Sequence, residues 1–84
     1  MVGAPVRLRA KKLQEGPGPG EIIVEVTTSA SRREEVIVHR SQMHDNGIEI
    51  GEPIHQRNDE RLVELPREAM SGTWRVWASE TELN

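Results

Sequence analysis

The side chains best suited to chemistry in this chain are three histidines and a serine that lies close to one of them. His39 and Ser41 are two residues apart, so a strand would place both on one face, as a base and a nucleophile require. No nucleophile-elbow pattern surrounds Ser41, and no third residue is placed to orient the imidazole. An 84-residue chain also leaves little room for a substrate cleft beside a core. We therefore expect a protein that is not an enzyme, with a small hydrolase or a metal-dependent enzyme as the remaining catalytic alternative.

The histidines do not predict a metal site either. Asn46-Gly47 is a strong hairpin signal, and a two-residue turn there pairs residues whose numbers sum to 93. In that register His44 and His55 share a face, but their positions are roughly 20 Å apart along the strand, whereas zinc ligands lie about 2 Å from the metal. His39 points to the opposite face, where we expect a hydrogen-bonded core histidine. With no cysteine in the chain, we expect no metal and no cofactor.

The apolar composition favours strands over helices. Val and Ile together number fourteen and Leu five, and β-branched residues suit a pleated surface. The core is small, since a domain of this length buries only about 60% of its unfolded surface. We expect a single β domain over residues 1–84, ordered from about 5 to 79, with a frayed polar tail.

The sequence also bears on location. No apolar run approaches the roughly 18 residues of a membrane span, so no membrane partner is expected. Residues 1–7 lack the apolar stretch of a signal peptide, and there is no cysteine. Both features favour the cytoplasm.

Period-2 alternation of apolar and polar residues marks a series of short strands. Strands are predicted at 6–11, 21–27, 35–43, 48–50, 61–65 and 73–78. The Gly- and Pro-rich residues 15–20 form a loop, Pro53 interrupts the returning strand of the hairpin as a bulge or an edge, and residues 66–70 form one helical turn opened by Pro66. The pattern predicts an all-β fold: a small antiparallel β-sandwich, immunoglobulin-like, or a small barrel of six to seven strands.

The hairpin register assigns each side chain to a face. The core face is expected to hold Ile37, His39, Met43, Ile48, Ile50 and Ile54. The solvated face is expected to hold Val36, Val38, Arg40, Gln42, His44, Glu49 and His55. A slip of one residue would turn Ile48 and Ile50 outward together, so the apolar pattern favours this register.

A late segment resembles part of a known module. Leu65-Pro66, followed by Ala69 and then by Ser71-Gly72-Thr73-Trp74-Arg75-Val76, is similar to the strand–corner–strand segment of immunoglobulin-like sandwich modules of the macroglobulin type and related bacterial repeats. The resemblance covers about 12 residues. It implies an interaction or structural module, with Trp74 filling the space between the sheets, and it implies no catalytic residues. Those modules continue with a further strand that is missing here, so an open sheet edge completed by another chain is also implied.

The two tryptophans are the only aromatic residues apart from the histidines. Alternation places Trp74, Val76 and Ala78 on the core side of the last strand, and Arg75 and Trp77 on the outer side. Two interpretations of Trp77 are open: it rests under a loop or against Val36 and Val38, or it is exposed beside Arg75. An exposed Trp beside an Arg is typical of interface anchors. The predicted interaction surface is Val36, Val38, Arg75 and Trp77. The expected function is a non-catalytic module that acts through protein–protein contact or self-association as a homo-oligomer.

The uneven charge leaves one alternative open. Residues 1–40 carry seven cationic and five anionic side chains, whereas residues 41–84 carry four and nine. A nucleic-acid-binding small barrel would use the basic residues Arg7, Arg9, Lys11, Arg32 and Arg33. The net charge of −3 and the absence of Phe and Tyr count against it, because single-strand binders usually stack bases on aromatic side chains.

Overall fold

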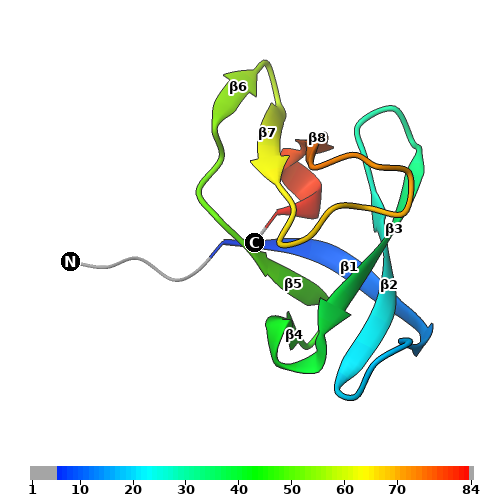
Figure 1. Ribbon diagram of the computed structural model, residues 1–84. Helices are drawn as coiled ribbons and strands as arrows, with labels where there is room; N and C mark the ends of the chain where they lie inside the picture. Colours follow the sequence, from blue (N-terminus) through cyan, green and yellow to red (C-terminus); the bar gives the residue numbers. More distant parts are fainter. Residues whose placement is uncertain (1–5, 84) are drawn as a thin grey trace.

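The computed structural model describes residues 6–83, in which antiparallel β-strands form two sheets (Figure 1). The first sheet has the order β3-β2-β1-β5-β4 and the second the order β6-β7-β8. The strands are β1 (Val6–Glu15), β2 (Glu21–Thr27), β3 (Arg33–His39), β4 (Met43–His44), β5 (Gly47–Ile50), β6 (His55–Arg57), β7 (Glu60–Glu64) and β8 (Arg75–Ser79). The prediction of a small all-β fold with antiparallel sheets is confirmed. Residues 1–5 belong to the stretch 1–7 that was predicted to lack a signal peptide, and they lie outside the described residues.

The helical content of residues 6–83 is limited to two 3₁₀ turns, η1 (Arg40–Gln42) and η2 (Glu80–Glu82). Neither lies at 66–70, where a helical turn was predicted; those residues form an irregular loop. No helix in this part of the chain is long and apolar enough to cross a membrane.

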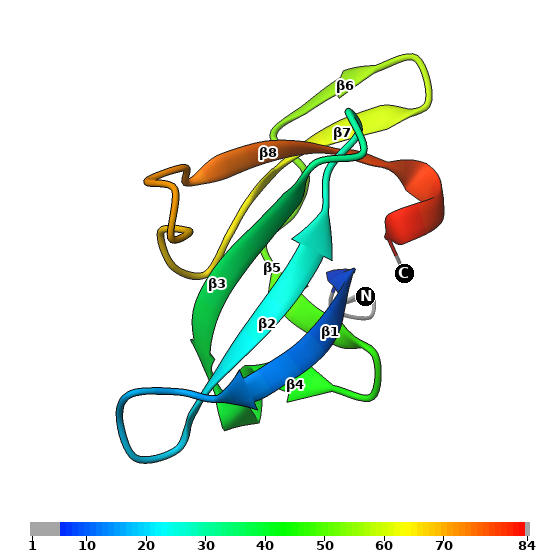
Figure 2. The ribbon, with the colours of Figure 1, turned by 90° about the vertical axis from the view of Figure 1, so that its right-hand side faces the viewer.

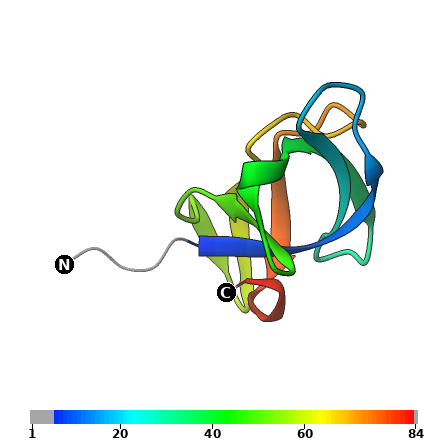
Figure 3. The same cartoon turned by 90° about the horizontal axis from the view of Figure 1, so that it is seen from below.

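Strand β1 joins the two halves of the large sheet. Its first residues pair with β5, from Val6 opposite Ile50 to Arg9 opposite Gly47. Its later residues pair with β2, from Ala10 opposite Val26 onward. The ladder with β2 shifts between Lys12 and Gln14, and such a bulge bends a strand and increases its twist. Seen from below, β1 and β2 curve around one side of the molecule (Figure 3).

The second sheet closes over the curved one. Strand β8 runs across the upper ends of β2 and β3 (Figure 2), where the Ser29 amide donates to the Trp77 carbonyl at 2.7 Å. One core lies between the sheets and draws on both. Its buried members are Leu8, Ala10, Ile22, Val24, Val26, Val36, Val38, Ile48, Ile50, Val63, Leu65, Ala69, Val76 and Ala78.

The predicted faces of β3 are wrong. Val36 and Val38 are fully buried, while His39 is exposed and Ile37 half-buried. The reason is that β3 does not run on into the hairpin: η1 separates it from β4, so alternation cannot be carried across that turn. Instead β3 takes its faces from β2, where Val24 opposes Val36 on the core side. Ile54, also predicted in the core, is 48% exposed.

The hairpin register differs from the prediction by two residues. Met43 pairs with Ile48 and His44 with Gly47, so the turn residues are Asp45 and Asn46 rather than Asn46 and Gly47. Asp45 takes the left-handed backbone, with φ of 54°, a conformation that Asp tolerates better than most residues. Because Met43 moves by two positions relative to its partner strand, its side chain stays on the face of Ile48, as predicted.

Gly47 is needed for close packing against β1 rather than for the turn. A Cβ atom on Gly47 would lie 3.2 Å from the Arg7 Cβ and 3.3 Å from the Leu8 carbonyl oxygen, tighter than an ordinary contact.

The tail also differs from the prediction. Residues 80–82 form η2, and Leu83 makes a β-bridge with Leu8 and packs against the core. Its apolar side chain supplies the contact that a polar tail lacks.

The core assignment predicts a contrast between two isoleucines. Ile48→Ala should lower the free energy of unfolding by about 2–4 kcal/mol, because it leaves a cavity at a fully buried site. Ile54→Ala makes the same change at an exposed site and should cost no more than about 0.5 kcal/mol. Urea unfolding of both variants measures the difference, and equal losses would contradict the observed core.

Candidate functional site

Two of the four residues of the predicted interaction surface are buried in the core. Val36 and Val38 have no exposed surface, so their outward placement was wrong. Trp77 is half-buried and Arg75 is exposed. These four residues therefore do not form one outer patch.

Trp77 is covered by the β6–β7 hairpin. Register places His55, Leu62 and Trp77 in one row on the outer face of the small sheet. The Arg57 guanidinium lies 4.0 Å from the centre of the Trp77 ring, a cation–π arrangement, and the His55 ring meets Trp77 edge-on at 6.0 Å. Trp77 is thus already engaged by its own chain.

The hairpin arginine is itself held in position. The Arg57 side chain donates to the Glu60 carboxylate through Nε at 3.0 Å and Nη2 at 2.9 Å. These hydrogen bonds from Arg57 are the main reason that the pKa of Glu60 lies below its ordinary value.

Trp74 is the tryptophan that faces solvent. It is 54% exposed, which corrects the prediction that it fills the space between the sheets. Strand β8 begins only at Arg75, where the ladder with β7 ends at Glu64, so the alternation that buries Val76 and Ala78 does not reach Trp74. Met70, in the same 66–74 loop, is 64% exposed.

The 66–74 loop is fixed to the body of the protein despite its irregular path. The Leu65 amide donates to the Trp74 carbonyl, and the Ala69 amide to the Thr73 carbonyl, each at 2.8 Å. The Met70 amide donates to the Glu35 carbonyl at 2.8 Å, which attaches the loop to the edge of β3. Two side-chain interactions also hold the loop. Arg67 forms an ion pair with Glu21, and the Ser71 hydroxyl donates to the Glu34 carboxylate, both at 2.6 Å.

Trp74 and Met70 are the functional candidates that sequence reasoning missed. The signal in the sequence was Ser71-Gly72, a pair typical of turns. In the structure Gly72 has φ of 92°, so the turn ends there and the strand begins only after it. A strand starting two residues later would have left Trp74 outside the alternating pattern.

The basic residues proposed for nucleic acid fall into two places. Arg7, Arg9 and Lys11 line one groove along β1 with a volume of about 920 Å³. Arg32 lies in the β2–β3 turn, beside a separate hollow that also contacts Trp77. Arg33 opposes Thr27 on the far side of β2 and reaches Glu25 at 4.0 Å. The structure thus brings together three of the five predicted cations.

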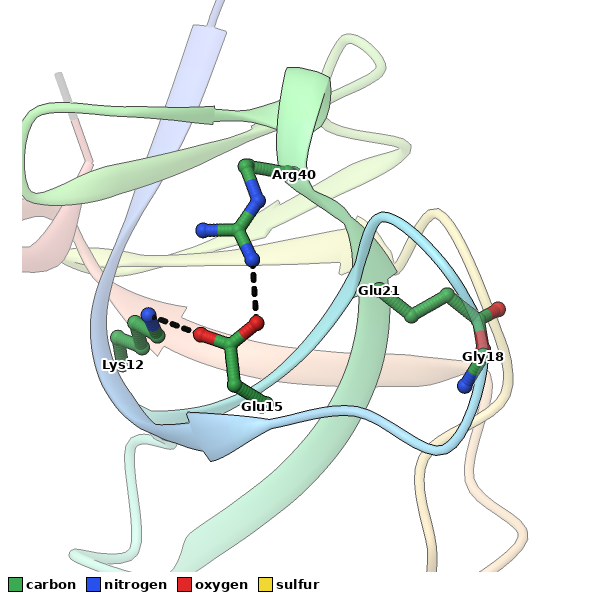
Figure 4. Close-up of polar contacts among 5 residues, drawn as sticks. All are labelled: Lys12, Glu15, Gly18, Glu21 and Arg40. Atoms are coloured by element: carbon green, nitrogen blue, oxygen red, sulfur yellow. Dashed lines mark hydrogen bonds and ion pairs between the residues drawn. The ribbon is translucent and has the colours of Figure 1, made fainter.

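An ionic cluster occupies the inside of the curved sheet at its lower end (Figure 4). Glu15 accepts a hydrogen bond from the Lys12 ammonium at 2.6 Å and another from the Arg40 guanidinium. The hydrogen bond from Lys12, and then that from Arg40, lowers the pKa of Glu15 below its ordinary value. In the adjacent loop, the Gly18 amide donates to the Glu21 carboxylate at 3.0 Å.

The histidines are placed differently from the prediction. His39 is exposed rather than in the core; its Nδ1 lies 2.8 Å from the Ser41 hydroxyl and accepts from the Ser41 amide at 3.2 Å. This contact caps η1. His44 lies on the outer side of the hairpin, with Nε2 at 2.6 Å from Glu49. Within residues 6–83, no three His, Asp or Glu side chains are grouped to hold a metal ion.

Comparisons with protein-family models, with curated proteins and with solved structures found no match to this chain. The resemblance of residues 65–76 to macroglobulin-type modules therefore stays a prediction, and one of its structural expectations, a Trp74 between the sheets, is not met.

The Glu15 cluster predicts a pH-dependent contribution to stability. Glu15→Gln removes the charge that Lys12 and Arg40 neutralise. A carboxylate with a lowered folded-state pKa stabilises the fold above its unfolded pKa, ordinarily 4.5, and that stabilisation is lost as the pH falls through the folded-state pKa. The deficit of the variant should therefore be present at pH 7 and disappear in acid. Because the group is solvent-exposed, we expect a small deficit.

Chemical unfolding of parent and variant at pH 7 and near pH 3 measures this deficit. Glu52→Gln is the matched control, because Glu52 is exposed in the β5–β6 connection and makes no ion pair with residues 6–83. A Glu15→Gln deficit that is the same at both pH values would show that the cluster acts by packing and not by charge.

Proposed function

We propose that this protein is a non-catalytic interaction module that associates with a second copy of itself through the 66–74 loop. The observation that carries the proposal is the exposure of Trp74 in a chain with only two tryptophans and no Phe or Tyr. Tryptophan is enriched among the residues that dominate binding energy at interfaces. Met70, the most exposed of the large apolar residues within positions 6–83, lies in the same loop.

The Trp74 side chain is held in place before any partner binds. Its indole Nε1 donates to the Glu68 carboxylate at 2.9 Å, and its carbonyl accepts from the Leu65 amide. A side chain already fixed loses little conformational entropy on association, which is the advantage of a preorganised anchor.

The charges around Trp74 suit an identical partner. Arg67 and Arg75 and the acids Glu64 and Glu68 lie in or beside the loop. The loop also contacts Glu21 and Glu34, so the surface carries charges of both signs. In a two-fold contact the same surface meets itself, and an Arg of one copy can then face a Glu of the other. Arg75 now pairs with Glu64 at 3.2 Å with both side chains at least half exposed, so exchange of partners costs little.

The size of the domain adds a reason for association. A chain of this length leaves much of its apolar surface in water, and burial of Trp74 and Met70 would gain about 25 cal/mol per Å² of apolar area removed from water.

The test is the solution mass by light scattering across a tenfold concentration range, with tryptophan emission recorded on the same samples. We expect the mass to rise towards that of a dimer and the emission to shift to the blue, because Trp74 leaves water. Trp74→Ala should weaken dimerisation by at least about tenfold, as removal of a central anchor costs more than about 1.4 kcal/mol. Its fold should persist, since Trp74 is more than half exposed and is not a member of the buried core.

Ile54→Ala is the matched control. It removes an apolar side chain that is 48% exposed. The β5–β6 connection that carries it lies on the left of Figure 1, away from the 66–74 loop on the right. The variant should therefore leave the dimer intact. A protein that is monomeric at every concentration, or a Trp74→Ala variant with the mass of the parent, would overturn the proposal of self-association.

A further inference from the structure

The groove along β1 presents a regular row of cations that the proposed dimer does not use. Leu8 and Ala10 are buried in the core, so Arg7, Arg9 and Lys11 project together from the opposite face of the strand. Alternate residues of a strand are roughly 6.6 Å apart. This spacing is comparable to that of successive phosphates along an extended nucleic acid strand.

These cations keep most of their binding capacity. Arg7 makes no ion pair with residues 6–83, and its Nε atom is buried without a hydrogen-bond partner among them. Glu49, opposite Arg7 in the ladder, is instead bonded to His44 at 2.6 Å. Among the described residues, Arg9 pairs only with Glu82, at 3.7 Å, and its side chain is 69% exposed.

Lys11 is the least engaged of the three. It is exposed and makes no ion pair within the described part of the chain. Lys12, by contrast, is bonded to Glu15 at 2.6 Å. The two neighbouring lysines thus differ in availability, and the free one belongs to the groove row.

The walls of the groove add neutral donors and a few acids. The hairpin turn brings Asn46, and the end of the chain brings Thr81. Amides and hydroxyls of this kind commonly contact phosphate oxygens. The acids Glu25, Asp45 and Glu82 also line it, and they set a limit on its affinity for any anion.

We propose that this groove binds the sugar–phosphate backbone of single-stranded nucleic acid without regard to sequence. Neither tryptophan lines it, so the bases find no indole ring to stack on and the phosphates supply most of the contact. Arginine suits this ligand because its planar guanidinium binds phosphate oxygens in pairs. Arg32, outside the groove, has no part in the site.

The test is fluorescence anisotropy of a labelled 20-nucleotide oligo-dT, titrated with the full chain at several salt concentrations. Three phosphate contacts to a single strand give a log–log slope against salt of about −2. Lys11→Gln should reduce the slope by about 0.7, and Arg9→Gln together with Lys11→Gln should raise Kd at low salt by about tenfold. Both changes are at exposed side chains, and urea unfolding checks that the variants fold.

Arg32→Gln is the matched control, because it removes the same charge from an exposed site outside the groove. It should leave both Kd and slope unchanged. The proposal is overturned if oligo-dT does not bind at low salt, or if Arg32→Gln weakens binding as much as Lys11→Gln. It is also overturned if poly-glutamate displaces oligo-dT at an equal concentration of charges, because the groove would then be a site for acidic peptides. Trp74→Ala should bind oligo-dT like the parent, which separates this result from that of the dimer.

Discussion

The rest of the structure depends on the division of β1 between two partners. Val6 to Arg9 pair with β5, and Ala10 to Glu15 pair with β2. At the change of partner, the Ala10 amide donates to the Asn46 carbonyl at 2.8 Å. Without this shared strand the hairpin β4–β5 and the pair β2–β3 would be separate two-stranded units, which are marginal in water. In the same strand Leu8 and Ala10 face the core, and the alternate residues Arg7, Arg9 and Lys11 face outward. The pairing of β1 therefore determines both the fold and the lining of the groove.

The two tryptophans show how local context decides whether an aromatic side chain is available. Trp77 lies within a strand, and the neighbouring hairpin supplies Arg57 to cover its ring at 4.0 Å. Trp74 lies just before the strand, where its side chain stays 54% exposed, and its indole nitrogen donates to Glu68. One ring therefore contributes to the stability of the small sheet, and the other is presented to solvent in a fixed orientation.

Much of the fold could be predicted from the sequence, because strand alternation records which side chains face the core. The bounds of β2 follow directly from Ile22, Val24 and Val26, all buried. The faces of β3 could not be predicted, because they depend on a 3₁₀ turn at 40–42 that has no apolar signature. The position of Trp74 was missed for a related reason, since the place where β8 begins is set by its ladder with β7. The basic row was visible in Arg7, Arg9 and Lys11, but only the structure separates it from Arg32.

The bridge between Leu8 and Leu83 also bears on how the chain reaches its native state. It joins the two ends of the described chain, and β1 must wait for β5 before its first half has a ladder partner. Contacts between distant parts of a sequence require closure of long loops and slow the folding of small β proteins. The hairpins β2–β3 and β6–β7 are local and can form early, whereas docking of the last residues onto β1 belongs to the end of the reaction. During synthesis the first half of β1 therefore has no ladder partner until residues 47–50 have been made, and its bridge to Leu83 forms later still.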